Sequence, residues 1–300
     1  MSEHHILGDW GSSRLRLWLV CDDTIVDRCE GPSIIGLVGS PVDALQAAIE
    51  PWFAHSAAHS ITLCGMAGAR GGLMEVPYAE TPLTAAEWAT CASQFVVDGL
   101  SVRIAAGCAL RQSAGGRDDT MRGEETQVFG ALELAPALSE GKQLVILPGT
   151  HSKWVWLDDG RIADFRTFVT GELFALLQSS SLLTLAETGD GIGEDEGFAI
   201  GITRSLRQPL LGCLFTARAA QLRSGKSGRW ASGYLSGLLI GSEMAEMRSA
   251  NRLPAGVTII GEPALARRYA QGLASYGVET MVLDGEACAL AGLRIIDADH

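Results

Sequence analysis

The sequence has no cluster of basic residues. Its 300 residues include 23 Lys and Arg against 35 Asp and Glu, which gives a formal net charge of −12 at pH 7. Proteins that bind DNA, RNA or an anionic membrane surface need clustered Lys and Arg. We therefore expect neither nucleic acid nor a membrane among its partners.

Long hydrophobic runs are also missing. No uninterrupted apolar stretch is long enough to span a bilayer, and the first residues, Met1-Ser2-Glu3-His4-His5, lack the positive start and apolar core of a signal peptide. These features predict a cytoplasmic protein. At 47% hydrophobic and 19% charged residues the composition is that of a globular protein, and the length favours two domains.

Metal-binding spacings of cysteine and histidine are absent as well. The seven cysteines are an odd number without a close C-x-x-C pair, which predicts reduced residues in the core. The six histidines fall mostly in the N-terminal tail, around 55–59 and at the C-terminus, so we expect no zinc site.

Two loops rich in glycine and small hydroxyl residues each join a hydrophobic strand to a second strand. They are Asp9-Trp10-Gly11-Ser12-Ser13-Arg14 and Pro148-Gly149-Thr150-His151-Ser152-Lys153. Glycine lets backbone N–H groups approach phosphate oxygens, hydroxyls donate further hydrogen bonds, and an aspartate can hold Mg²⁺ against the phosphates. One such loop is typical of an ordinary surface hairpin. Two of them predict a nucleotide site that grips phosphates from two sides.

The order of the expected elements repeats in the two halves of the chain. The first half predicts strands near 5–9, 14–21, 24–29, 61–64 and 102–105, and helices from Ser40, from the capping-box pattern Thr84–Glu87 to about 97, and over 124–135. The second half predicts strands near 144–148, 153–157, 161–168, 257–260 and 278–283, and helices opened by Thr170, by Pro263 and near 286, with a long helical insertion ending near 250.

This shared order predicts an α/β protein with two similar lobes around a cleft. We expect an N-terminal lobe over 1–140 that carries the first phosphate loop and the sugar-acid site. A C-terminal lobe over 141–300 is expected to carry the second loop and the adenosine site. The last helix, about 286–297, is expected to pack back toward the first lobe.

Seven motifs together resemble those of the 2-keto-3-deoxygalactonate kinases, in the sugar kinase, heat-shock protein 70 and actin superfamily. They are Asp9–Arg16, Gly65–Arg70, Met121–Gln127, Leu147–Val155, Thr170–Leu173, Tyr234–Gly241 and Gly261–Leu265, and they span nearly the whole chain. The resemblance implies two duplicated ribonuclease H-like lobes of the actin-like ATPase fold, with an interlobe cleft and a helical insertion in the second lobe. It also implies transfer of the terminal phosphate of ATP to the 6-hydroxyl of 2-dehydro-3-deoxy-D-galactonate.

Phosphoryl transfer from ATP needs Mg²⁺, hydrogen-bond donors around the phosphates and a base for the acceptor hydroxyl. We expect Asp9 to orient Mg²⁺ through a bound water molecule. The expected phosphate contacts are Gly11, Ser12, Ser13, Arg14, Gly149, Thr150, His151, Ser152 and Lys153.

The best candidates for the base are Glu124 and Glu125, at the start of a helix just before the second lobe. In sugar kinases of this arrangement a carboxylate at this place takes the proton from the sugar hydroxyl. The helix N-terminus is expected to keep the carboxylate ionised, as a base must be. Acidic residues also simply stabilise helix starts, and Asp164 on a later strand is a weaker alternative.

A sugar acid needs a cationic partner, for which we expect Arg70 in its glycine-rich loop and Arg122 beside the proposed base. Arg70 could instead bind only water or a surface carboxylate. The family resemblance usually shows a tryptophan where this chain has Leu73. That departure concerns the lining of the substrate pocket and leaves the catalytic assignment alone.

The adenine end of ATP is expected at Gly261, where a buried strand ends before a helix and a flat base can approach the backbone. A plain strand-to-helix turn is the alternative. Gly237 and Gly241 are expected to let another helix or the nucleotide approach closely, and core packing is the favoured role. Gly225-Lys226-Ser227 copies the end of a P-loop, but Ala220 stands where the motif needs glycine, which predicts a solvated loop.

Three alternatives to this kinase stay open. One is a kinase of another sugar or sugar acid on the same fold, and a second is a phosphatase that releases inorganic phosphate without an acceptor. The third is a non-enzymatic nucleotide- or sugar-binding regulator or polymer. A regulator would carry a DNA-binding helix pair, which we do not expect because the first phosphate loop starts within ten residues of Met1. Self-association into a homo-oligomer is an open alternative.

Overall fold

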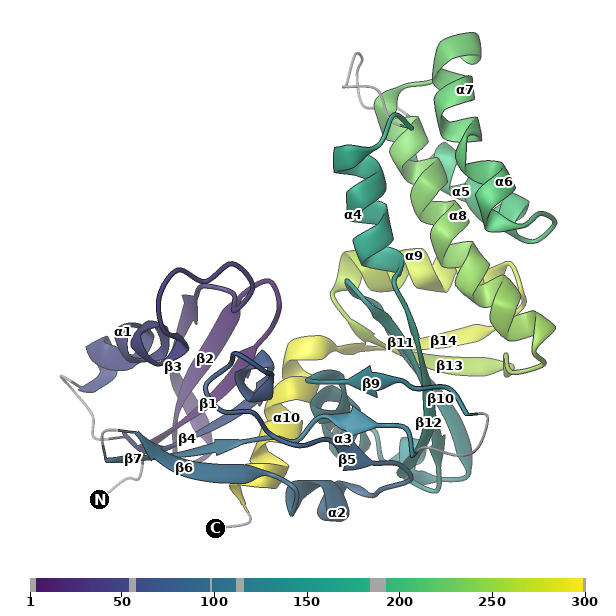
Figure 1. Cartoon of the computed structure of the whole chain (residues 1–300). Helices are drawn as coiled ribbons and strands as arrows, with labels where there is room; N and C mark the ends of the chain where they lie inside the picture. The colour runs from purple at the N-terminus through teal and green to yellow at the C-terminus, as the bar shows by residue number, and fades with distance from the viewer. Residues whose placement is uncertain (1–3, 54–57, 98, 112–115, 184–192, 299–300) are drawn as a thin grey trace. The chain divides into compact units, whose positions relative to one another are not determined.

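The computed structural model describes residues 4–53, 58–97, 99–111, 116–183 and 193–298 (Figure 1). Part of the expected helical insertion, 184–192, lies outside the described residues. The chain divides into two compact units. Unit 1 comprises Met1–Gln143, Val155–Arg166 and Leu283–His300, and unit 2 comprises Leu144–Trp154 and Thr167–Val282. The predicted lobes 1–140 and 141–300 remain a prediction.

The strands are β1 (His4–Trp10), β2 (Leu15–Cys21), β3 (Thr24–Gly31), β4 (Ala58–Gly65), β5 (Ala79–Glu80), β6 (Ser93–Val97), β7 (Leu100–Ile104), β8 (Cys108–Ala109), β9 (Thr120–Met121), β10 (Lys142–Leu147), β11 (Ser152–Asp158), β12 (Arg161–Phe168), β13 (Gly256–Gly261) and β14 (Glu279–Asp284). The helices are α1 (Pro41–Phe53), α2 (Ala85–Ala89), α3 (Glu124–Leu134), α4 (Thr170–Ser180), α5 (Glu194–Ser205), α6 (Leu210–Leu214), α7 (Thr216–Ser224), α8 (Gly228–Ser249), α9 (Pro263–Ala274) and α10 (Gly285–Asp297), with short 3₁₀ turns at Met66–Gly68 and Pro136–Ser139.

The first large sheet has the strand order β3-β2-β1-β4-β7-β6. Strand β1 pairs antiparallel with β2 and parallel with β4, so the alternating hydrophobic residues of β1 and β2 form a buried centre. The parallel pairing leaves the ends of β1 and β4 at one edge, with Trp10 opposite Gly65. The Asp9 loop, which starts at the end of β1, and the segment Gly65–Arg70, which starts at the end of β4, therefore leave from neighbouring strands.

The second large sheet repeats this order as β12-β11-β10-β13-β14. Its first strand, β10, pairs parallel with β13, just as β1 pairs with β4. In each sheet three consecutive strands are followed by a strand placed on the other side of the first one. The predicted duplication is therefore present in the topology of the sheets.

The expected helix over 84–97 is wrong. The capping box is present, because Thr84 accepts a hydrogen bond from the N–H of Glu87 and the Glu87 side chain accepts one from Thr84 N, but helix α2 ends at Ala89. The following strand β6 pairs antiparallel with β7, with Phe95 opposite Val102. Pairing with β7 satisfies the backbone of this β-branched and aromatic run, which outweighs continuation of the helix. The small sheet β5-β8-β9 has no counterpart among the expected strands.

Helix α10 packs against α3, β1 and β4 within unit 1. The helices meet at glycines: a side chain on Gly292 would start 2.0 Å from the carbonyl oxygen of Thr126, and one on Gly130 would start 1.9 Å from that of Cys288. Only glycine allows the two backbones to come this close. The first turn of α3, which holds the candidate bases, is therefore fixed against the last helix of the chain.

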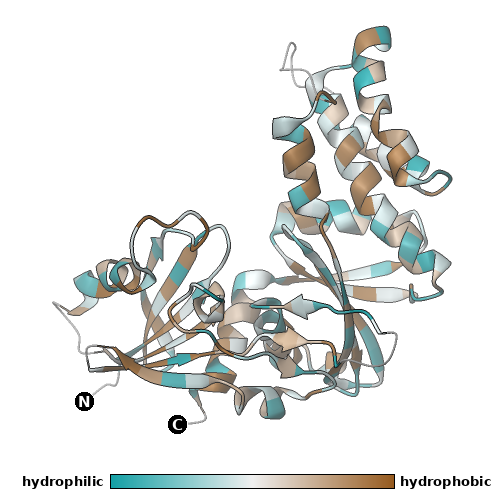
Figure 2. Cartoon of the chain, viewed as in Figure 1, coloured by the Kyte–Doolittle hydropathy of each residue, from teal (hydrophilic) through white to brown (hydrophobic). Residues whose placement is uncertain are grey.

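The helical insertion of unit 2 is organised around α8, which contacts α4, α5, α6, α7 and α9. Gly237 lies against the backbone of Phe198 and Gly241 lies against Ser205, so their role is helix packing. Hydrophobic residues recur along the helices of the insertion (Figure 2). Leu176 of α4, Leu211 of α6 and Leu222 of α7 are exposed. Of the helices that the structure describes, none has both the length and the apolar character that a membrane crossing requires.

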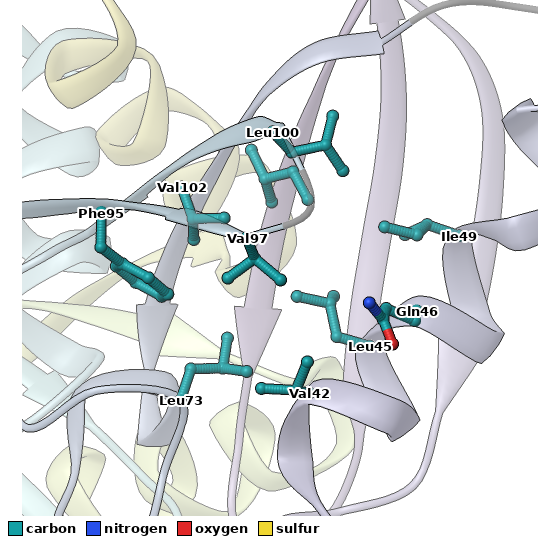
Figure 3. A pocket seen from close by; sticks show the side chains of 10 residues that line it. Val42, Leu45, Gln46, Ile49, Leu73, Phe95, Val97, Leu100 and Val102 are labelled. Carbon is teal, nitrogen blue, oxygen red and sulfur yellow. The ribbon is translucent and has the colours of Figure 1, made fainter.

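Leu73 is half-buried in unit 1. Figure 3 shows its side chain beside Val42, across a small apolar cavity from Val97 and Val102. The cavity measures about 20 Å³, which is about the space that one water molecule needs. The position where the family resemblance expects tryptophan therefore packs under helix α1.

Candidate active site

Asp9 stands near the end of β1 and is 8% exposed. Residues 9 and 16 are directly opposite in the β1–β2 hairpin, and Arg16 donates a short hydrogen bond to Oδ2 of Asp9. The other carboxylate oxygen, Oδ1, lies 3.7 Å from the thiol sulfur of Cys64. Arg16 thus orients the Asp9 carboxylate, with only one of the two oxygens engaged by a cation.

Gly65 and Gly123 bring two further segments to this place. A side chain on Gly65, which has φ of +73°, would start 2.6 Å from the carbonyl oxygen of Trp10 and 3.3 Å from Oδ1 of Asp9. A side chain on Gly123 would start 3.2 Å from the Cα of Gly65. These contacts leave no room for side chains at Gly65 and Gly123. They show that the Asp9 loop, the end of β4 and the start of α3 lie against one another within unit 1.

Glu124 and Glu125 begin helix α3 in different environments. Glu124 is half-buried, and its Oε2 accepts a hydrogen bond of 3.0 Å from the backbone N–H of Arg122. Glu125 has no exposed surface, and both of its oxygens lie 2.8 Å from the N–H of Gly123. An acceptor hydroxyl therefore has direct access to Glu124 and none to Glu125 in this conformation.

The expectation that the helix N-terminus keeps both carboxylates ionised is wrong for Glu125. Burial, together with the charge of Glu124, raises the pKa of Glu125 from 4.5 to about 8, although hydrogen bonds from Gly123 oppose the shift. Desolvation penalises the charged form more than the helix terminus stabilises it. Glu125 is consequently protonated at neutral pH.

The two candidate arginines also differ. Arg70 is exposed in the turn that follows Gly65. Arg122 is held in place, with Nη2 donating to the carbonyl of Val76 at 2.7 Å and the guanidinium stacked 4.2 Å above the ring of Tyr78. Its Nε and Nη1 atoms are shielded from solvent and have no acceptor among the described residues. A substrate carboxylate can reach Arg70 directly, whereas it reaches Arg122 only after neighbouring atoms move.

The first phosphate loop is open to solvent. Ser12, Ser13 and Arg14 are exposed, and the loop is closed by a hydrogen bond of 2.9 Å from the N–H of Gly11 to the carbonyl of Arg14. The guanidinium of Arg14 lies 3.1 Å from Glu30 at the surface. The two serine hydroxyls are therefore available to a phosphate group.

The second phosphate loop lies in unit 2 and is supported by the start of α4. No atom lies within 4 Å of where a side chain on Gly149 would begin, so the backbone there is open to a ligand. Behind it, a side chain on Gly171 would start 2.3 Å from the carbonyl of Gly149, and the N–H of Glu172 donates to Thr150 at 2.9 Å. His151 is exposed and pairs with Glu172 at 2.6 Å.

Ser152 and Lys153, the last two residues of the expected phosphate loop, are buried at 0% and 4% exposure. The hydroxyl of Ser152 donates to Glu243 of α8 at 2.9 Å. It is thus occupied inside unit 2. Of the residues of the second loop that were expected to contact phosphates, the exposed ones are Thr150 and His151, with the open backbone of Gly149 beside them.

Gly261 ends β13 next to the second phosphate loop, because a side chain placed on it would begin 3.7 Å from Cδ of Pro148. Glu262 then caps α9 by accepting a hydrogen bond from the N–H of Leu265. The residue expected at the adenine end and the residues expected at the phosphates are therefore neighbours within unit 2.

Two candidates from the sequence take other places. Asp164 accepts a hydrogen bond of 2.8 Å from Arg117. The amino group of Lys226 lies 2.8 Å from Oε1 of Glu196. The segment Gly225-Lys226-Ser227 joins helix α7 to helix α8, whereas a P-loop joins a strand to a helix.

The residues at Asp9 fit a Mg²⁺ ion that is shared with phosphate. No group of three or more His, Cys, Asp or Glu side chains able to hold a metal occurs in the described part of the chain. Mg²⁺ in phosphoryl-transfer sites is typically held by one or two carboxylates, several waters and the substrate phosphates. Asp9, whose Oδ2 is bonded to Arg16 and whose Oδ1 lies beside the thiol of Cys64, would be the single carboxylate of such a site.

The topology of the sheets and the two loops define the class of protein: the chain has the actin-like ATPase fold of sugar kinases. The acetate kinase of Entamoeba histolytica aligns over 96% of this chain and 97% of its own, with a TM-score of 0.51 at 8% identity, a likeness that shows the fold alone.

Within this class, the chain belongs to the 2-keto-3-deoxy-galactonokinase family, whose model matches residues 9–296. A "Probable 2-dehydro-3-deoxygalactonokinase" of Rhizobium meliloti (strain 1021) is 36% identical, over 95% of this chain and 94% of the relative. The 2-dehydro-3-deoxygalactonokinase of Escherichia coli (strain K12) is 33% identical, over 99% of this chain and 98% of the relative.

A crystal structure from Sinorhizobium meliloti, described as that of a 2-dehydro-3-deoxygalactonokinase protein, superposes with a TM-score of 0.85 at 34% identity and covers 98% of both chains. The predicted family, the predicted fold and the predicted class of phosphotransferase are confirmed.

Sequence reasoning missed three residues that shape these sites. Arg16 could have been found from the hairpin register, because a tight turn after β1 places it opposite Asp9. Gly65 carried a weaker signal, a glycine directly after a buried strand. Glu243 gave no signal beyond one acidic residue in an apolar helix, and its partners come from distant parts of the chain.

Proposed function

We propose that this protein transfers the terminal phosphate of ATP to the 6-hydroxyl of 2-dehydro-3-deoxy-D-galactonate. Membership of the family and the names of the relatives support the substrate. The observation that carries the proposal at the level of residues is the convergence of Asp9, Gly65 and the start of α3 in unit 1. It brings a carboxylate suited to Mg²⁺ near a carboxylate suited to proton abstraction.

In this proposal Asp9 holds a hydrated Mg²⁺, and Arg16 keeps the carboxylate in its orientation. Mg²⁺, when bound, neutralises charge on the phosphates of ATP. Within unit 1 the proposed donors to phosphate oxygens are the hydroxyls of Ser12 and Ser13, and within unit 2 they are the backbone N–H groups of Gly149 and Thr150. Gly261 lies beside the adenosine end.

Glu124 acts as the base. It is half-buried and accessible, so it can accept the proton of the sugar hydroxyl as the oxygen attacks phosphorus. Glu125 is buried and protonated, and it holds the first turn of α3 through Gly123. The proposal therefore assigns the role of the base to Glu124 and not to Glu125.

Arg70 binds the carboxylate of the sugar acid directly, since its side chain is exposed in the turn after Gly65. Arg122 is the second cationic candidate, because two of its buried donors have no acceptor among the described residues and an acceptor there would be stabilising.

We also propose a cytoplasmic location, where ATP is present and thiols stay reduced. None of the seven cysteines, all of which lie among the described residues, forms a disulfide.

The test is to incubate the protein with ATP, Mg²⁺ and 2-dehydro-3-deoxy-D-galactonate and to locate the phosphate in the product by ³¹P NMR. We expect a single phosphorylated product with phosphate on the 6-oxygen. Glu124→Gln should lower kcat by on the order of 100-fold or more, whereas Glu125→Gln should retain most of it. Phosphate on another oxygen would refute the proposed reaction, and equal losses in the two variants would refute the choice of Glu124.

A further inference from the structure

Glu243 is a carboxylic acid inside unit 2 with four hydrogen-bond donors around it. It is 2% exposed on helix α8. Its Oε2 accepts from the hydroxyl of Ser152 at 2.9 Å and from the indole N–H of Trp154 at 2.7 Å. Its Oε1 accepts from the hydroxyl of Tyr269 at 2.7 Å and from that of Thr170 through a short bond. A buried acid costs stability unless it is well bonded, so four partners at one carboxyl group indicate a structural requirement.

Two of these donors belong to the end of the second phosphate loop and the strand that continues it, and two belong to helices. Ser152 is in the loop and begins strand β11, Trp154 follows the loop on the same strand, and Thr170 is the first residue of α4. Tyr269 belongs to α9, so its hydrogen bond to Glu243 is not part of the link between the loop and α4. The elements are labelled in Figure 1. Glu243 therefore ties the strand that leaves the loop to the helix that supports it.

The support given by α4 is direct. Gly171 packs on the carbonyl of Gly149, and the N–H of Glu172 donates to the carbonyl of Thr150 at 2.9 Å. Both contacts follow immediately after Thr170 in the chain. A shift of the first turn of α4 would therefore move the backbone at Gly149 and Thr150, where the ligand-facing side is open.

We propose that Glu243 is a positioning residue for ATP: by joining Ser152 and Trp154 to Thr170, it fixes the phosphate-binding backbone of Gly149 and Thr150. The inference rests on the proposed function only in taking this loop as the phosphate site. It assigns Glu243 no contact with ATP or sugar acid. Its effect should therefore appear in the affinity for ATP and not in the KM for the sugar acid.

The deciding comparison uses two variants that each remove one donor from the same carboxylate oxygen. Thr170→Val removes the donor on the loop-supporting helix, and Tyr269→Phe removes the donor on α9. Both lose one buried hydrogen bond, so both should lower Tm by similar amounts. The dissociation constant of a non-hydrolysable ATP analogue, measured by calorimetry without sugar acid, should rise about tenfold in Thr170→Val and stay within twofold in Tyr269→Phe.

A second pair changes Glu243 itself. In Glu243→Gln the amide oxygen can still accept hydrogen bonds from the hydroxyl of Ser152 and the indole N–H of Trp154. The oxygen must face Trp154 because an indole N–H can only donate. The amide N–H group can then donate to the hydroxyls of Thr170 and Tyr269, which can also accept. We expect Glu243→Gln to bind the analogue within threefold of the original protein and Glu243→Leu to bind it at least tenfold more weakly.

Equal analogue affinity in Thr170→Val, Tyr269→Phe and the original protein would overturn the inference, as would equal weakening in the two variants, because Glu243 would then serve stability alone. This comparison holds even if Glu243→Leu does not fold. If the protein binds the analogue but does not phosphorylate the sugar acid, the proposed substrate is wrong, and the binding data still decide the role of Glu243.

Discussion

Replacing Glu125 by glutamine should remove a pH dependence of stability that the structure assigns to this one side chain. Burial raises the pKa of Glu125 from 4.5 to about 8 in the folded protein, and in the unfolded chain it returns to its ordinary value. The folded state then binds the proton more tightly than the unfolded state. The stabilisation is complete below pH 4.5 and is lost progressively as pH rises to about 8.

The size follows from the slope of about 1.4 kcal/mol per pH unit for one proton. Between pH 5.5 and 7.5 the original protein should lose about 3 kcal/mol through Glu125 relative to Glu125→Gln. With an unfolding entropy of about 2 cal/mol/K per residue, this corresponds to a difference in Tm of about 5 °C for a chain of this length.

The assay is thermal unfolding at half-unit steps between pH 5 and 8.5, followed by differential scanning calorimetry. Glu133→Gln is the matched control, because Glu133 is an exposed glutamate on the same helix α3. The control should follow the original protein at every pH, while Glu125→Gln should gain stability relative to it as pH rises. Parallel curves for Glu125→Gln and the original protein would show that Glu125 is ionised in the fold, and the assignment of a protonated buried acid would be wrong.

Three further substitutions test the remaining assignments. Asp9→Asn should lower kcat on the order of 100-fold and raise the Mg²⁺ concentration needed for half-maximal rate, as steady-state kinetics would show, and an unchanged Mg²⁺ response would place the metal elsewhere. Arg70→Ala should raise the KM for the sugar acid about tenfold or more with little change in the KM for ATP, and the opposite split would assign Arg70 to phosphate. Leu73→Trp should lower the free energy of unfolding in urea by about 1–3 kcal/mol, because the cavity of about 20 Å³ is too small for an indole ring. The KM values for ATP and for the sugar acid should stay unchanged. A changed KM for the sugar acid would show that residue 73 lines the substrate pocket.

Most strands of the two large sheets could be predicted from the sequence because each of them carries its own local pattern. Alternating residues in β2 and the turn at Asp158–Gly160 mark strands and a hairpin without reference to the rest of the chain. The capping box at Thr84 also predicted where α2 begins. Its end could not be predicted, because the pairing of Phe95 with Val102 on another strand decides it.

The site was predictable where it is built from loops and unpredictable where it depends on burial. The glycine and hydroxyl residues of the two phosphate loops stand together in the sequence. The protonation state of Glu125 depends on its burial next to Gly123 and on the packing of helix α10 against α3. Gly292 of α10 lies against Thr126 although the two residues are far apart in the chain. The rule that helix starts favour ionised carboxylates holds at exposed ends, and it fails here because the side chain is desolvated.

Glu243 shows the same limit more strongly. Its four partners lie between 26 and 91 residues away from it in the chain. A single acidic residue in the apolar stretch of α8 indicates an unusual position, but only the folded structure reveals which donors meet it.

The proposed function requires that the enzyme phosphorylate a sugar acid and not a neutral sugar. The most direct measurement is a coupled ADP-release assay with Mg²⁺ and ATP across a panel of 2-keto-3-deoxy sugar acids, with glucose and glycerol as neutral acceptors and a reaction without acceptor. We expect ADP release with 2-dehydro-3-deoxy-D-galactonate well above every neutral acceptor and above the reaction without acceptor. Turnover of a neutral sugar alone, or ATP hydrolysis without acceptor as fast as transfer, would contradict the account.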